Sequence, residues 1–118
     1  GTSSRAIINA LRKGGARKIS LVITYPPIKF PCFAGIDFPS QEELATHTDG
    51  NDYSDKQIIE KVRNDIGADF LGYNDPENLA GAIGIPVDSM CFTCTTGNYS
   101  SLGIKPIFKT LTQLEDSK

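Results

Sequence analysis

Apolar residues recur along the chain first at helical spacing, then at strand spacing, and the cycle repeats. Ile7, Ile8 and Leu11 share one face of a predicted helix over 5–13. The β-branched stretch 18–24 predicts a buried strand. A second helix, a short strand over 69–73 and a third helix follow. The order helix, strand, loop, helix, strand, helix predicts an α/β fold in one unit over residues 1–118.

Capping and stop residues bound these predicted helices. A serine followed three positions later by Glu or Gln can form a capping box, and glycine ends a helix in the left-handed conformation. The expected signals are Ser3 or Ser4 with Gly14 or Gly15, Ser40 with Glu43 in a short helix, Ser54 with Gly67, and Asp75 before Pro76 with Gly84. The faces expected to be buried are Ile58, Ile59, Val62 and Ile66 in the second helix and Leu79, Ala82 and Ile83 in the third.

Composition narrows the class of protein. The chain has 118 residues, 39% of them hydrophobic and 22% charged, with a net charge of −2. No basic field points to nucleic acid or to an anionic membrane, and no apolar run is long enough to span a bilayer. An odd number of cysteines without an export signal favours a reducing cytoplasm. Residues 104–118 predict a weakly helical segment that ends in a flexible charged tail.

Three cysteines carry the most specific chemistry. Two residues separate Cys91 from Cys94, so that one tight turn can aim both sulfurs at a single point, and Cys32 lies in an irregular loop rich in aromatic residues and proline. The C-x-x-C spacing suits a metal ion, an iron–sulfur cluster or a redox disulfide. The distant third cysteine favours a metal, but three sulfurs do not complete a four-coordinate site.

Several stretches together resemble one enzyme family. The opening Gly1-Thr2-Ser3-Ser4 before a helix resembles the end of the phosphate loop of a type I phosphoribosyltransferase. The run from Tyr25 to Pro39, the shorter stretches 42–44 and 66–69, and the cysteine-bearing run 91–99 resemble the amidophosphoribosyltransferases, also called glutamine phosphoribosylpyrophosphate amidotransferases. The loop 47–53 is longer than is usual in that family, and Ser100 stands where the family often has proline.

This resemblance implies the C-terminal portion of a type I phosphoribosyltransferase domain. The family makes 5-phosphoribosylamine from phosphoribosyl pyrophosphate and glutamine, at the first step of de novo purine synthesis. Its glutamine-hydrolysing domain and its acidic substrate motif would precede Gly1, so that this chain would hold no catalytic residue and would be inactive alone. Gly1, Thr2 and Ser3 would contact the substrate 5-phosphate, and magnesium would act in the parent enzyme. The implied partners are the remainder of that enzyme, phosphoribosyl pyrophosphate and further copies in a homo-oligomer.

The resemblance also implies a use for the cysteines. Some members of the family carry a structural [4Fe–4S] cluster on four cysteines, and Cys32, Cys91 and Cys94 match three of them. The fourth would lie outside this chain. Members without these cysteines work without a cluster, so its role would be structural or regulatory.

Two other functions remain open on the residues themselves. A redox module would use Cys91 and Cys94 as a dithiol, with no role for Cys32. A small zinc-binding module would use the three cysteines and His47, the single histidine of the chain.

Overall fold

The computed structural model describes residues 2–32, 44–48 and 51–103. The expectations for Gly1, for the capping box of Ser40 and Glu43, and for the segment 104–118 lie outside these residues.

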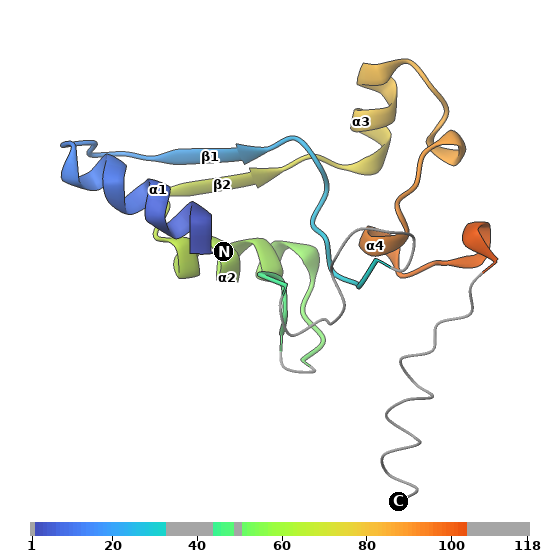
Figure 1. The fold of residues 1–118 in the computed structure, drawn as a ribbon, viewed down its shortest axis with the longest axis horizontal. Coiled ribbons are helices and arrows are strands. Elements are labelled where there is room, and N and C mark those ends of the chain that lie inside the picture. The colour runs from blue at the N-terminus through green and yellow to red at the C-terminus, as the bar shows by residue number, and fades with distance from the viewer. Residues whose placement is uncertain (1, 33–43, 49–50, 104–118) are drawn as a thin grey trace, which may run out of the picture.

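Two parallel strands pair to form the sheet of the described structure (Figure 1). Helix α1 (Thr2–Lys13) leads to β1 (Ser20–Ile23), and α2 (Asp55–Ile66) leads to β2 (Phe70–Tyr73), which pairs with β1 in a register from Ser20↔Phe70 to Ile23↔Tyr73. The helix α3 (Pro76–Ile83) follows, and then come three single turns, η1 (Val87–Ser89), α4 (Thr93–Thr96) and η2 (Ser100–Leu102). The expected α/β order is confirmed. None of the described helices is long and apolar enough to cross a membrane.

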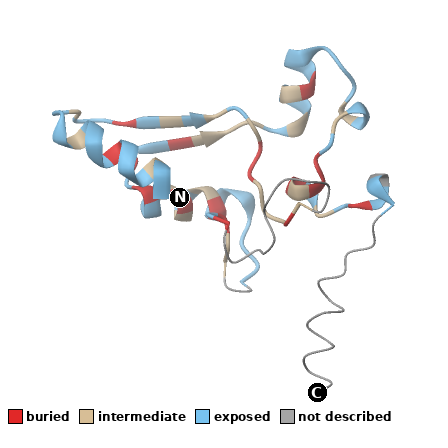
Figure 2. Cartoon of the chain, in the orientation of Figure 1, coloured by how far each residue is buried: buried red, intermediate tan, exposed pale blue. Residues whose placement is uncertain are grey.

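The main core lies where α1 and α2 meet one face of the two strands (Figures 1 and 2). Parallel strands joined through a helix bury the face on which that helix packs. The buried members of this core are Ile8 of α1, Val62 and Ile66 of α2, and Leu71 of β2. Ile19, before β1, and Ala68, before β2, complete it. The opposite face of the sheet is uncovered in the described structure, since Val22 is 69% exposed and Phe70 is 52% exposed.

The cap and stop signals of α2 and α3 are confirmed. The Ser54 side chain accepts a hydrogen bond from the Gln57 backbone N–H, and the Gln57 side chain accepts one from the Ser54 N–H, which completes the capping box of α2. Gly67 ends α2 in the left-handed conformation with φ 79°. Asp75 caps α3 through the Asn78 N–H, as expected for Asp before proline.

Several expectations about helix start and burial are wrong. Helix α1 already begins at Thr2, so Ser3 and Ser4 lie within it and do not cap it. Only Ile8 of its expected face is buried, because α2 covers just part of that face. Strand β1 is half-buried, since the sheet has a covered and an uncovered side. In α3 the buried residue is Ala80, while Ala82 and Ile83 are exposed.

Candidate functional site

Two segments far apart in the sequence meet at the turn α4 (Figure 1). The first follows β1 and runs to Cys32, and the second, 91–99, comes after α3. The backbone N–H groups of Lys29 and Phe30 both donate to the carbonyl oxygen of Cys94, each at 2.9 Å. The first segment is thereby fixed to the turn that carries Cys94, although more than sixty positions separate them in sequence.

Two tyrosines join the same segments through their side chains. The Tyr99 phenol donates to the Pro31 carbonyl at 2.6 Å, and Tyr99 is the largest fully buried side chain of the described structure. The Tyr25 phenol donates to the Cys91 carbonyl at 3.0 Å, and its ring stacks on Phe92 with 5.8 Å between centroids. Each cysteine is therefore within one residue of a backbone group that a hydrogen bond holds.

The turn α4 positions Cys94, and Gly97 ends it. Gly97 has φ 73°, which side chains rarely tolerate, and a Cβ there would lie 3.0 to 3.2 Å from ring atoms of Phe30. Glycine at this position lets Phe30 pack directly against the end of the turn. This contact adds to the two backbone hydrogen bonds on Cys94.

All three thiols are free, and they differ in environment. Cys91 is exposed, and its sulfur lies 3.5 Å from the Thr93 hydroxyl, which lowers the pKa of the Cys91 thiol. Burial raises the pKa of the half-buried Cys94, and the thiolate charges of nearby Cys32 and Cys91 raise it further.

Cys32 and Cys91 lie close enough to Cys94 for their charges to act on its pKa, but the described residues form no metal site there. In the part of the chain that the structure describes, no three side chains of His, Cys, Asp or Glu gather closely enough to hold one metal ion. His47 lines a separate hollow of about 400 Å³ with Lys29 and Tyr53 among its other walls. Among the described residues, His47 belongs to no group of three side chains that could hold a metal ion.

One buried side-chain oxygen beside Cys94 lacks a hydrogen-bond partner in the described structure. Thr95 is 7% exposed, and its hydroxyl oxygen has no hydrogen-bond partner in the described structure. A hydroxyl can donate to a thiolate or to an inorganic sulfide, and thiolates are the ligands of iron–sulfur clusters. In the described structure, however, neither the thiols nor this hydroxyl form a closed set of ligands.

The expected phosphate-binding residues lie at the start of α1. Thr2 and Ser3 form its first turn, both are exposed, and no acidic residue lies in that turn. The first N–H groups of a helix lack intrahelical partners, and the helix dipole gives this end a partial positive charge. The arrangement is compatible with an anion.

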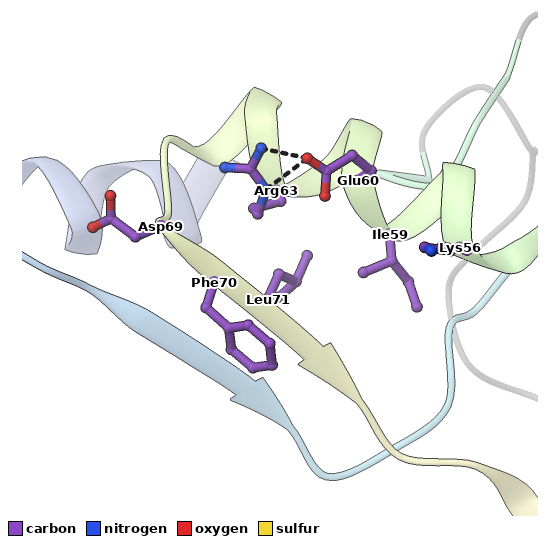
Figure 3. A pocket seen from close by; sticks show the side chains of 7 residues that line it. All are labelled: Lys56, Ile59, Glu60, Arg63, Asp69, Phe70 and Leu71. Carbon is purple, nitrogen blue, oxygen red and sulfur yellow. Dashed lines mark hydrogen bonds and ion pairs between the residues drawn. The ribbon is translucent and has the colours of Figure 1, made fainter.

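A further hollow lies between α2 and the start of β2 (Figure 3). It measures about 650 Å³, and an ion pair between Arg63 and Glu60 occupies its wall. Phe70 and Leu71 line its other side. Nothing in its lining pairs a nucleophile with a base, so we do not assign it a reaction.

Four residues of the site were not assigned a role from the sequence. Tyr25 and Tyr99 belong to the cysteine segments, and the available signal was an aromatic ring next to Pro26 in one segment and two positions after Gly97 in the other. Thr93 and Thr95 lie next to the cysteines, but a hydroxyl's partner depends on the fold.

Comparison with known proteins gives a consistent result, although no protein-family model matches the chain. It is 38% identical over 99 residues to the amidophosphoribosyltransferase of Mycobacterium leprae, covering 84% of this chain and 17% of that protein. It is 38% identical over 103 residues to the amidophosphoribosyltransferase of Bacillus subtilis, covering 84% of this chain and 20% of that protein. The chain therefore spans about a fifth of the length of these relatives.

Solved structures give the same result for the fold. The glutamine phosphoribosylpyrophosphate amidotransferase of B. subtilis, complexed with ADP and GMP, matches with a TM-score of 0.66 and 36% identity, over 83% of this chain and 21% of that one. A structure described as the allosteric regulatory enzyme of purine biosynthesis matches with a TM-score of 0.67 and 35% identity. The match covers 83% of this chain and 20% of that one. Sequence and fold agree over nearly the same share of the chain, which therefore belongs, as a matching segment, to the amidophosphoribosyltransferase family.

Proposed function

We propose that this chain is the C-terminal part of the phosphoribosyltransferase domain of an amidophosphoribosyltransferase. In the complete cytoplasmic enzyme, ammonia from glutamine displaces pyrophosphate from phosphoribosyl pyrophosphate and gives 5-phosphoribosylamine. The observation that carries the proposal is the shared identity of 35–38% with a TM-score of 0.66 to 0.67 over one continuous α/β unit. The remainder of the enzyme supplies the other four fifths of the length, including the magnesium-dependent substrate motif.

The chain's contribution to substrate binding is the start of α1. We assign Gly1, Thr2 and Ser3 to the 5-phosphate, because free amides, exposed hydroxyls and the absence of first-turn acids favour an anion there. Titration with inorganic phosphate, followed by amide NMR, should move the resonances of residues 2–5. Movement confined to other residues would remove this assignment.

The chain's contribution to a cofactor is the set Cys32, Cys91 and Cys94. These thiolates would hold three irons of a [4Fe–4S] cluster, which supplies a structural crosslink, and the fourth ligand lies outside this chain. Anaerobic reconstitution with an added thiol should give bound iron and sulfide in equal amounts. Cys→Ser at any of the three should lower both, and bound zinc without sulfide would contradict the assignment.

The 118 residues hold no complete catalytic apparatus in this proposal. No described residue pairs a nucleophile with a base, and the chain matches only a fifth of its relatives. The purified chain should therefore form no phosphoribosylamine from glutamine or from ammonia. Turnover above background would overturn this reading.

One observation favours a second function, a dithiol redox module. Cys91 is exposed and has a lowered pKa, while Cys94 is half-buried, as in a pair with one attacking and one protected thiol. A reversible disulfide between them, in a chain that takes up no iron, would favour this alternative. Bound iron and sulfide would favour the cluster.

A further inference from the structure

Two half-buried thiols, Cys32 and Cys94, belong to segments that hydrogen bonds already hold together. The Phe30 N–H donates to the Cys94 carbonyl at 2.9 Å, and Phe30 lies two positions before Cys32. The Tyr99 phenol donates at 2.6 Å to the carbonyl of Pro31, which directly precedes Cys32. These two contacts fix the backbone that leads into Cys32 to the segment that carries Cys94.

The third thiol, Cys91, is placed differently. It is exposed, and its sulfur lies 3.5 Å from the Thr93 hydroxyl. The charge of Cys32 acts on Cys94 more strongly than the charge of Cys91 does, and a Coulomb interaction weakens with distance and with exposure to water. Burial raises the pKa of Tyr99, and the charges of Cys94 and Cys32 raise it further. Cys32 is therefore the better placed partner for Cys94.

We propose that Cys32 and Cys94 form a disulfide when the chain meets an oxidising low-molecular-weight disulfide, and that this bond is a redox switch which locks the segment after β1 onto the turn α4. One thiolate attacks the small disulfide and releases one small thiol. The second thiolate attacks the resulting mixed disulfide and releases the other small thiol. The chain loses two electrons and two protons, the small disulfide gains them, and an excess of dithiol reverses the reaction.

This inference goes beyond the proposed function, because it needs neither a cluster nor the rest of the enzyme. It also differs from the dithiol redox module, which bonds Cys91 to Cys94, whereas this switch leaves Cys91 free. A disulfide that closes a long loop removes conformations from the unfolded chain. The oxidised chain should therefore unfold at a higher temperature than the reduced chain.

The test treats the whole 118-residue chain, reduced and free of iron, with glutathione disulfide, and then blocks the remaining thiols with iodoacetamide. Phe92 lies between Cys91 and Cys94, so cleavage by chymotrypsin separates these two thiols before mass spectrometry. The expected product is one intramolecular disulfide between Cys32 and Cys94, with Cys91 alkylated. Its unfolding temperature should exceed that of the reduced chain, and dithiothreitol should return it to the reduced value.

Cys91→Ser and Cys94→Ser are matched variants, because each removes one thiol of the C-x-x-C pair. Cys91→Ser should keep the crosslink and the rise in unfolding temperature, and Cys94→Ser should lose both. A disulfide between Cys91 and Cys94 would contradict the inference and support the redox module. Free thiols throughout, glutathione adducts alone, or a crosslink between two chains would also contradict it, and the cluster assignment would still have its own test in bound iron and sulfide.

Discussion

The Tyr99 hydroxyl lies 2.6 Å from the carbonyl oxygen of Pro31, across 68 positions of sequence. This buried hydrogen bond fixes the residue before Cys32 to the segment that carries the other two cysteines. The geometry of the cysteine site therefore depends on a contact outside the cysteines themselves.

Replacing Tyr99 by Phe should destabilise the fold and loosen the position of Cys32. The change leaves the Pro31 carbonyl without this donor, which typically costs about 1–3 kcal/mol for a buried group. Urea unfolding should show the loss. Tyr53→Phe is the matched control, since Tyr53 is 41% exposed, and it should stay close to the unmodified chain. Equal stability of the two variants would show that the Tyr99 hydroxyl contributes nothing.

Gly97→Ala should be more harmful than Gly84→Ala, although both glycines have positive φ. The left-handed backbone alone costs an alanine about 1–2 kcal/mol. At Gly84 no atom lies within 4 Å of the added Cβ, whereas at Gly97 the Phe30 ring lies 3.0 Å away. Thermal unfolding of both variants measures the difference. Equal losses would mean that Phe30 yields freely and does not brace the cysteine turn.

Asp69 should make the fold more stable above its unfolded pKa than below it. Its carboxylate accepts from the Ile19 N–H at 2.7 Å and from Arg12 at 2.8 Å, and these contacts lower the pKa of Asp69. The ionised form therefore favours the fold above about pH 4, the usual aspartate value, and this contribution disappears as the pH falls through the lower folded pKa.

Asp69→Asn should flatten this acid dependence in unfolding series between pH 7 and pH 2. Asp88→Asn, on the exposed turn η1, serves as the control and should keep the dependence. An unchanged acid slope in Asp69→Asn would assign the dependence to other carboxylates.

How much of this structure the sequence predicted depends on how far apart the interacting residues are. The cap of Ser54 with Gln57 and the stop at Gly67 are local, and each was predicted correctly. The exposure of Ile7 and Val22 was not predicted, because it depends on which other elements cover that face of the helix or of the sheet. The Pro31–Tyr99 contact links distant segments, so no local pattern indicated it. The resemblance to a family grouped the three cysteines, but it did not indicate the hydrogen bonds of Tyr25 and Tyr99 that hold their segments.

The uncovered face of the sheet should make the isolated chain self-associate. Val22 pairs with Gly72 in the register, and the Phe70 ring packs over Gly72, so both apolar side chains lie on the same open face. Apolar surface of this kind favours association. Sedimentation velocity should show larger species at higher concentration, and Phe70→Ser should reduce them. Ile83→Ser is the control: Ile83 lies in α3, away from this face, and its side chain is 56% exposed, so its replacement should not reduce the larger species. A monomer at every concentration would contradict this expectation.

The central claim is that this chain serves as a working segment of an amidophosphoribosyltransferase, and a segment exchange tests it most directly. This chain would replace the matching segment of the B. subtilis enzyme, which is 38% identical over 103 residues. Glutamine hydrolysis by the chimera's other domain would report that the protein is folded. The account predicts formation of 5-phosphoribosylamine from phosphoribosyl pyrophosphate and glutamine. A chimera that hydrolyses glutamine, binds phosphoribosyl pyrophosphate and forms no phosphoribosylamine would contradict it.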